Sequence, residues 1–408
     1  MKKQLFTLVI LFLLLTGKLT AQFTNTIQTI TPNGVFDIVY DRFGNQYPLV
    51  NLSLSAARPL SNSPYSVSSV ITNSCRAGYF DLYFAPGSYF DLNSGAANIL
   101  CEIYKNISGF ISSPLSLSTN TVNRINIYCD NIPASAPAGA LAAAAAFYAF
   151  PFNPPNPNGG ALDSQIERAL KSGQNAYSGL LVNAIAGANN FYSGLVYINP
   201  AVSWNLSIST GTIASTDYDA YSVLLHEVTH TLGFASLMGS NGISVFGSSN
   251  NYFSSYDRFL KDAAGNYLLA GPSGACPSSS LTFNSTLSAL GSATTGCISD
   301  ITTCSTAVHY VSTRTNVAVY TPNCFEPASS LSHFEDLCTV PASFTAPATC
   351  TTNPGPYNNL YYAMSNANSS GSCYVKRHLK PEERDVLCDI GYSVNPTFTS
   401  SAVSASVN

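Results

Sequence analysis

Apolar positions along the chain follow two spacings. Continuous or alternating apolar runs predict strands, and apolar residues three or four positions apart predict helices. The predicted strands lie at 79–84, 122–128 and 195–198, and the predicted helices lie at 96–111 and 163–178. Because strands and helices alternate in this order, we expect an α/β sheet over this part of the chain.

A third helix is predicted after the last of these strands. Thr216 and Asp219 are spaced as a capping box at its start. Gly233 stands where a left-handed residue would end it. Between these signals runs an apolar stripe at helical spacing. The stripe consists of Tyr221, Leu224, Leu225, Val228 and Leu232.

Three further parts of the chain have other patterns. Residues 22–73 are predicted to be a β-rich segment, with a hairpin formed by 34–40 and 43–49. Residues 395–408 are a Ser/Thr-rich tail without a core pattern. Between 235 and 394 the sequence predicts loops and short strands, followed by a closing helix that begins at Pro381 and ends near Cys388.

Residues 1–21 have the pattern of a secretory signal peptide. Two lysines precede an apolar stretch over 5–15, and small residues end the segment at Ala21. No other apolar run reaches the roughly 18 residues of a membrane helix. The nearest run, 138–150, is bounded by prolines and is expected to be a buried segment. We therefore expect a secreted or cell-surface protein without a membrane anchor.

Composition indicates where the disulfides lie and which partners are expected. The chain has 11 cysteines, and 8 of them follow residue 234, so an exported chain would carry its disulfides mainly in the second half. The odd number leaves at least one cysteine without a partner in the chain. Charged residues make up only 9%, the net charge is -4 and there is no basic run. Nucleic acid is therefore not an expected partner, and we expect a monomer.

The predicted central helix carries the candidate chemistry. Residues 226–234 read H-E-V-T-H-T-L-G-F. Histidines four positions apart lie one turn from each other on one helix face, so His226 and His230 can reach a single Zn²⁺. Glu227 then has the position of a general base. With 5 His and 7 Glu in 408 residues, chance gives on the order of 0.001 such motifs.

The helix supplies two ligands, whereas a catalytic zinc usually takes three from the protein. In the compact arrangement H-E-x-x-H-x-x-G-x-x-H the third would fall at Ser236, which is a poor zinc ligand. His378 lies among cationic residues, and His309 lies in a strand-like run typical of a packed side chain. His333 is flanked by small polar residues and by acids that could fix its tautomer. His333 is the favoured third ligand, with His309 as the alternative.

These motifs resemble the leishmanolysin-like metzincins, a group of zinc metallopeptidases. In that group the zinc helix reads H-E-x-x-H-x-L-G-F, as residues 226–234 do, and an insertion separates it from S-H-aromatic-E, as at 332–335. A methionine turn follows, matched by Met364, and then a closing helix that ends D-x-G-aromatic, matched by 389–392. The likeness covers roughly residues 75–394.

The resemblance implies a metzincin-like fold, of the α+β or α/β class, over residues 74–394. A subdomain over about 74–234 would hold the twisted sheet and the zinc helix. A subdomain over about 235–394 would be irregular and disulfide-rich, with the closing helix. Met364 would lie under the zinc site, whereas Met238 is expected in the core.

The resemblance also implies an activity. His226, His230 and His333 would hold Zn²⁺, and Glu227 would be the general base of a secreted endopeptidase that hydrolyses protein or peptide substrates. An exported adhesion or binding module that keeps a structural zinc site is the alternative from another class. A zinc hydrolase of non-peptide amides is a third possibility.

Two further expectations concern side chains near the site. Tyr361 or Tyr362, beside the methionine turn, could stabilise an oxyanion. Cys75-Arg76 resembles the cysteine switches by which some metzincins mask their metal. In an exported, cysteine-rich chain a disulfide is the favoured role of Cys75.

Overall fold

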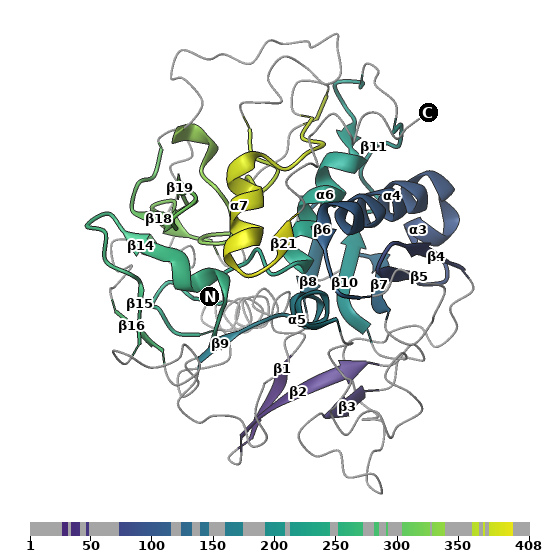
Figure 1. Ribbon diagram of the computed structural model, residues 1–408. Helices are drawn as coiled ribbons and strands as arrows, with labels where there is room; N and C mark the ends of the chain where they lie inside the picture. The colour runs from purple at the N-terminus through teal and green to yellow at the C-terminus, as the bar shows by residue number, and fades with distance from the viewer. Residues whose placement is uncertain are drawn as a thin grey trace, which may run out of the picture.

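The computed structural model describes the conformation of most of the central part of the chain (Figure 1). The described residues are 27–31, 34–40, 46–48, 73–115, 124–132, 139–146, 160–173, 192–208, 213–244, 252–271, 281–284, 291–292, 304–326, 329–338, 361–366, 370–371 and 375–394. The predicted signal peptide and the predicted tail both lie outside these residues.

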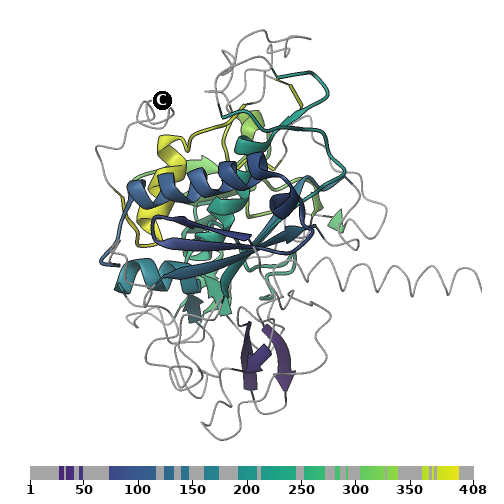
Figure 2. The ribbon, with the colours of Figure 1, turned by 90° about the vertical axis from the view of Figure 1, so that its right-hand side faces the viewer.

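A twisted sheet of five strands forms the centre of the protein (Figure 2). In spatial order its strands are β4 (Asn73–Ala77), β5 (Phe80–Phe84), β7 (Ile125–Asn131), β10 (Tyr192–Ile198) and β8 (Ala142–Ala146). β5, β7 and β10 run parallel, whereas β4 and β8 run antiparallel to their neighbours. The expected sheet is therefore present in mixed form, and the protein is of the α+β class.

Two long helices cover this sheet. α4 (Ser94–Phe110) packs on β4 and β5, α6 (Ala220–Thr231) packs on β8 and β10, and the two helices contact each other (Figure 1). Both helices were predicted, α4 to within two residues at its start. Burying its apolar stripe stabilises the fold by about 1.5–3 kcal/mol for each side chain. The buried members of that stripe are Ile99, Leu100, Ile103, Tyr104 and Ile107.

The helix predicted at 163–178 is shorter in the structure. α5 spans Gln165–Ser172 and begins with a capping box between Ser164 and Glu167. It ends because Gly173 has φ 71, a left-handed conformation that costs glycine little. A Cβ at Gly173 would also lie only 2.9 Å from Pro114. Residues 174–178 of the prediction lie outside the described residues.

The other elements are short. The predicted N-terminal hairpin is confirmed by the antiparallel pairing of β2 (Gly34–Tyr40) with β3 (Gln46–Pro48), and β1 (Ile27–Thr31) pairs with β2 on the other side. The predicted closing helix is α7 (Pro381–Asp389). The remaining elements are α3 (Tyr89–Leu92), β6 (Ile111–Ser112), β9 (Gly160–Leu162), β11 (Trp204–Asn205), β12 (Tyr218–Asp219), β13 (Tyr252–Ser254), η4 (Tyr256–Phe259), β14 (Leu260–Asp262), β15 (Leu269–Ala270), β16 (Thr282–Phe283), β17 (Gly291–Ser292), β18 (Val308–Val311), β19 (Asn316–Ala318), β20 (Cys324–Phe325), η6 (Asp336–Cys338) and β21 (Ser393–Val394).

One hydrophobic cluster runs through both predicted subdomains. It includes Phe80 from the sheet, Phe234 after α6, Met364 and Leu387 from α7, each fully buried. The predicted buried segment 138–150 contributes β8, while residues 147–150 lie outside the described residues. The two predicted subdomains thus share a core, which fixes the second against α6.

Two disulfides are found among the described residues. Cys75–Cys101 joins β4 to α4, and Cys304–Cys338 joins two segments of the second half. Cys129 is buried and free, and Cys388 is also free. The favoured role of Cys75 is confirmed, and a disulfide-bonded sulfur cannot serve as a thiolate ligand that masks a metal.

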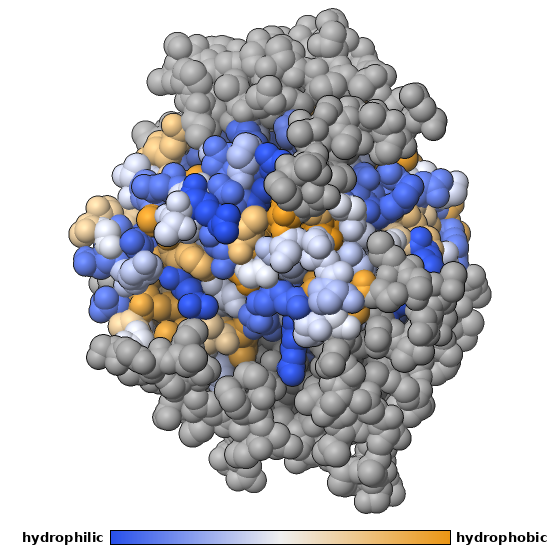
Figure 3. Space-filling view, viewed as in Figure 1, coloured by the Kyte–Doolittle hydropathy of each residue, from blue (hydrophilic) through white to orange (hydrophobic). Residues whose placement is uncertain are grey.

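Among the described residues, no helix is long and apolar enough to cross a membrane. Hydrophilic and hydrophobic side chains are interspersed over the described part of the face shown in Figure 3. Among the described residues, the exposed large apolar side chains, Leu92, Ile243 and Tyr267, belong to separate elements and loops. Single exposed apolar residues of this kind are normal on a folded protein.

Candidate metal centre

The start of α6 is fixed by Asp219 rather than by the predicted Thr216 box. Asp219 is the N-cap, with extended backbone, and its carboxylate accepts hydrogen bonds from the N–H and the hydroxyl of Ser222, at 3.2 and 2.6 Å. The Thr216 prediction is wrong because residues 218–219 are extended in β12. The helix therefore begins one turn later than the sequence pattern indicated.

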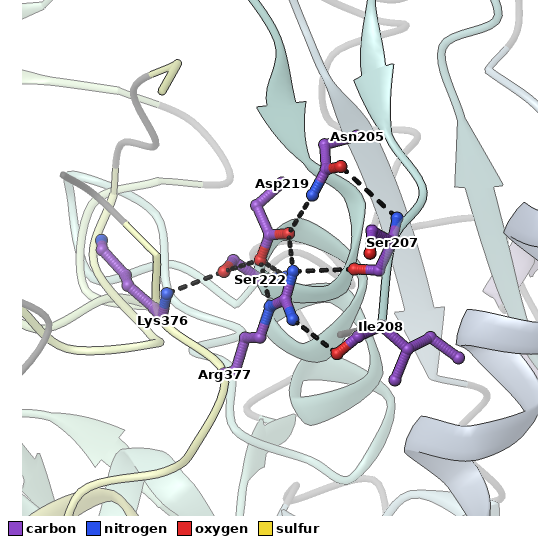
Figure 4. Close-up of polar contacts among 7 residues, drawn as sticks. All are labelled: Asn205, Ser207, Ile208, Asp219, Ser222, Lys376 and Arg377. Atoms are coloured by element: carbon purple, nitrogen blue, oxygen red, sulfur yellow. Dashed lines mark hydrogen bonds and ion pairs between the residues drawn. The ribbon is translucent and has the colours of Figure 1, made fainter. Parts of the chain in front are cut away.

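A polar network around Asp219 ties the helix start to the segment before α7 (Figure 4). Arg377 binds both carboxylate oxygens of Asp219, at 2.9 and 2.6 Å. The same guanidinium donates to the carbonyls of Ser207 and Ile208, at 2.9 and 2.8 Å. The backbone N–H of Lys376 donates to the hydroxyl of Ser222 at 2.7 Å. No sequence pattern indicated this network, because Lys376 and Arg377 lie more than 150 positions from Ser222 and Asp219.

The end of α6 is fixed by Gly233, as predicted. Gly233 has φ 94, and its N–H donates to the carbonyl of His230 at 3.0 Å. A Cβ at this position would lie 3.1 Å from Glu167, in a conformation that side chains rarely adopt. The turn brings the carbonyl of Phe234 back to His230, whose Nδ1 donates to it at 2.7 Å.

The third histidine lies in the segment 329–335, which precedes η6. Leu331 has φ 69 and is the one non-glycine residue in the described part of the chain with a left-handed backbone. The carbonyl of His333 accepts from the N–H of Tyr320 at 2.8 Å, and the hydroxyl of Ser332 accepts from the N–H of Ser236 at 3.1 Å. Backbone strain of this kind persists only where surrounding contacts over-determine it.

His226, His230 and His333 converge in the folded chain. Each pair of Nε2 atoms is 3.1 Å apart. The rings of His226 and His333 are nearly parallel, at 13°, and the ring of His230 stands at 86° and 88° to them. They are the one group of candidate metal ligands found among the described residues. The predicted trio therefore comes together, although it spans more than 100 positions of sequence.

Hydrogen bonds at the far side of each ring fix its tautomer. The Nδ1 atoms of His226, His230 and His333 donate to the carbonyls of Ala363, Phe234 and Ser329, each at 2.7 Å. A proton on Nδ1 leaves the lone pair on Nε2, where a metal would bind. For His333 this role falls to a backbone carbonyl, so the prediction that neighbouring acids fix its tautomer is wrong.

The environment keeps the three rings neutral. Burial lowers the pKa of His230 to about 4. Burial lowers the pKa of His333 to about 3, and the repulsion that a second positive charge on the neighbouring His230 would cause acts in the same direction. Burial, with smaller effects from the other two histidines, holds the pKa of His226 well below its usual range. At neutral pH all three present unprotonated Nε2 atoms, as metal binding requires.

This arrangement fits a tetrahedral metal ion. Three nitrogen ligands at 2.0–2.1 Å from a tetrahedral ion lie about 3.3–3.4 Å from one another. The observed 3.1 Å separations need only a small expansion. Three lone pairs that converge at this spacing repel one another, and a cation at their centre would remove that repulsion. Three ligands also leave one tetrahedral position open.

Glu227 lies beside this centre on α6. Its side chain is 8% exposed and makes no hydrogen bond with the described residues. Burial raises the pKa of its carboxyl to about 8. A carboxyl with a pKa near the working pH can both accept and return a proton.

The turn that carries Met364 contacts His226 through the carbonyl of Ala363. Met364 is fully buried, its carbonyl accepts from the N–H of Phe334 at 2.8 Å, and its N–H donates to Glu383 at 2.6 Å. The N–H of Tyr362 donates to Asp336 at 2.8 Å. Asp336 also lies 3.7 Å from the ammonium of Lys376. Glu383 and Lys376 were missed at the sequence level as partners of this turn, whereas Asp336 was named there only as one of the acids beside His333.

The other candidates lie elsewhere. His309 is on β18, where its Nδ1 contacts the Asn316 amide oxygen at 3.1 Å, and His378 precedes α7; neither belongs to the histidine cluster. Tyr362 is buried against Phe334, with the ring centroids 5.1 Å apart. Of the two tyrosines proposed beside the methionine turn, Tyr361 is the more exposed.

Comparisons of the chain with family models, with curated proteins and with solved structures found no match. The assignment of a function therefore rests on the geometry of the three histidines and Glu227. Three buried histidines in this arrangement could hold a metal ion.

Proposed function

We propose that this chain is a zinc-dependent endopeptidase of the metzincin type. The observation that carries the proposal is the convergence of three Nε2 atoms at 3.1 Å, with the buried carboxyl of Glu227 next to His226 on α6. The leishmanolysin-like motifs at the zinc helix, at His333, at Met364 and at the closing helix support the same assignment.

Zinc is the metal that this donor set fits best. Imidazole nitrogens suit zinc, copper, iron and nickel, whereas magnesium and calcium prefer oxygen ligands. Three neutral imidazoles around a tetrahedral position are a common catalytic zinc site. His226, His230 and His333 would hold the ion, which when bound lowers the pKa of water and polarises a carbonyl oxygen.

The ligand count favours catalysis over a structural role. Structural zinc sites are closed by four protein ligands, and three are found here within the described residues. A structural site also has no use for a buried carboxylate with a raised pKa, such as that of Glu227. The adhesion-module alternative explains the histidines but leaves Glu227 without a role.

Glu227 would move the proton during hydrolysis. Its carboxylate would accept a proton from the attacking water and then deliver that proton to the nitrogen of the leaving amine. Among the described residues no hydrogen bond to this side chain must break before the transfer. Tyr361 would support the oxyanion of the substrate carbonyl from the segment next to Met364.

The substrate would bind along β8. This strand is at one end of the described five-stranded sheet and contacts α6. An extended peptide can add to such an edge through main-chain hydrogen bonds. β8 consists of five alanines, from Ala142 to Ala146. This arrangement favours an extended protein or peptide substrate over a small amide.

Secretion fits this activity. The two disulfides of the described residues are compatible with an oxidising, extracellular setting. The predicted signal peptide at 1–21 would direct the chain there.

Zinc content and casein hydrolysis test the proposal together. The purified protein should hold one zinc per chain, and a phenanthroline chelator should abolish hydrolysis. Glu227→Gln should keep the zinc and lose at least about 100-fold in turnover, because general acid–base catalysis contributes that much or more. His333→Ala should lose both zinc and activity, whereas His309→Ala should lose neither.

Near wild-type hydrolysis by Glu227→Gln would rule out the mechanism. One tightly bound zinc without hydrolysis of any peptide would favour the adhesion-module alternative.

A further inference from the structure

A single peptide group links α7 to a metal-binding histidine. The carbonyl of Ala363 accepts from Nδ1 of His226 at 2.7 Å. The N–H of the same peptide group, that of Met364, donates to Oε1 of Glu383 at 2.6 Å. The carboxylate, the amide and the imidazole therefore form one continuous chain of hydrogen bonds.

Hydrogen bonds in such a series allow the carboxylate to polarise the imidazole. A carboxylate that accepts from an amide N–H increases the negative charge on the carbonyl of that amide, since hydrogen bonds in series polarise one another. A stronger acceptor at Nδ1 in turn makes Nε2 a better metal donor. Carboxylate–histidine–metal triads act in this way by direct contact, and here the Ala363–Met364 amide stands between Glu383 and His226.

The surroundings strengthen the effect. Glu383 and Met364 are fully buried, and His226 is 7% exposed. Electrostatic interactions are stronger in such a medium than in water. The second oxygen of Glu383 accepts from the N–H of Lys380 at 2.6 Å, which fixes the carboxylate at the start of α7.

The other two ligands lack this connection. The amide that orients His230 carries the N–H of Ala235, which donates to the carbonyl of Gly233 at 2.9 Å. The amide that orients His333 carries the N–H of Ser330, which donates to the carbonyl of Glu326 at 2.9 Å. Both amides donate to neutral backbone acceptors, so among the described residues His226 is the histidine whose orienting amide ends on a carboxylate.

We propose that Glu383 is a positioning residue of the metal centre, which orients His226 and increases its donor strength through the Ala363–Met364 peptide. The inference rests on the metal-binding part of the proposed function and is independent of peptide hydrolysis. It assigns α7 a role in metal affinity, in addition to its place in the core.

Zinc affinity of the full chain, measured by chelator competition at pH 8, tests this role. Burial raises the pKa of Glu383 to about 7, so the carboxyl is mostly ionised at that pH. Glu383→Gln should bind zinc about 10–100-fold more weakly, the loss typical of groups that orient metal ligands. Glu383→Asp keeps the charge but withdraws it from Met364, and should lose a similar factor.

Two variants on α7 serve as controls. Glu382→Gln removes the neighbouring charge, which makes no hydrogen bond to the Met364 turn in the described residues, and should keep wild-type affinity. Leu387→Ala removes a fully buried core side chain. It should lower the thermal midpoint of the metal-free protein without changing the affinity of the folded form.

A spectroscopic measurement separates positioning from simple stability. With Co²⁺ in place of Zn²⁺, Glu383→Gln should shift the visible absorption bands of the bound ion, and Leu387→Ala should not. The inference is overturned if Glu383→Gln binds zinc within twofold of wild type, or if Leu387→Ala weakens binding equally. If wild type itself binds no zinc, the proposed function fails instead.

Discussion

The backbone N–H of Ser236 donates a hydrogen bond to the side-chain oxygen of Ser332 at 3.1 Å. Ser236 holds the place that the third ligand takes in the compact three-histidine motif, and Ser332 directly precedes His333, the candidate third ligand. The compact ligand position is therefore the point at which the loop of His333 is attached. The Ser236 hydroxyl donates to Asp257 at 2.5 Å, so its side chain has a structural role.

This attachment predicts that a histidine at 236 cannot replace His333. Ser236 is 6% exposed and its side chain points to the fully buried Asp257. His333→Ala should weaken zinc binding by at least about 100-fold, because a ligand is lost rather than an orienting group. Ser236→His in that background should not restore it. Zinc affinity within tenfold of wild type in the double variant would contradict this geometry.

Glu227 should make the metal-free protein less stable as pH rises. Burial raises the pKa of its carboxyl from 4.5 to about 8, so the folded state keeps a proton that the unfolded state releases between these values. The free energy of unfolding should therefore fall across this window, by at most about 1.4 kcal/mol per pH unit. Glu227→Gln does not titrate and should be more stable than wild type at pH 8.

Denaturant unfolding of the chelated protein at several pH values checks this sign. The stability gap between Glu227→Gln and wild type should shrink as pH is lowered towards 4.5. A gap that does not change with pH would show that the carboxyl is not held in a medium that disfavours its charge.

Asp219 and Arg377 should contribute to stability as a pair. The side chains are 4% and 16% exposed and bind at 2.6 Å, so removing one leaves a buried charge without its partner. Asp219→Ala should cost about 3–5 kcal/mol of unfolding free energy. Asp219→Asn should cost less, since asparagine is also a good N-cap. In a double-mutant cycle, Asp219→Ala with Arg377→Ala should cost clearly less than the sum of the single changes.

The Cys75–Cys101 disulfide should stabilise the protein without controlling activity. It closes a loop of 26 positions, for which loop entropy predicts about 3 kcal/mol. Cys75→Ser with Cys101→Ser should lower the unfolding free energy by that order. Peptidase activity at a permissive temperature should not rise. A gain of activity in the double variant would instead indicate a masking role for Cys75.

The sequence was most informative where the chemistry is local. The apolar stripe of the central helix, its glycine end at Gly233 and the spacing of His226 and His230 depend only on the period of a helix. These features are present in the structure. The start of the helix was misplaced because tertiary contacts of Asp219 with Arg377 extend the preceding residues into β12.

His333 could be named from sequence because few histidines compete for the role and because its neighbours match a known motif. The distance between its Nε2 and that of His226 could not be predicted from sequence. It depends on the left-handed backbone of Leu331 and on contacts with Ser236 and Tyr320. Such contacts join residues that no local spacing relates.

The sequence by itself determined the three candidate ligands, the candidate base and the longest helices, because a metal site needs particular side chains and a helix imposes a fixed period. Only the tertiary structure decided that Glu383 reaches His226 through the Ala363–Met364 peptide. It also decided that β8 runs antiparallel at the end of the described sheet, beside α6. Burial and packing bring these distant segments together. Such contacts between distant segments produce no periodic pattern in the sequence.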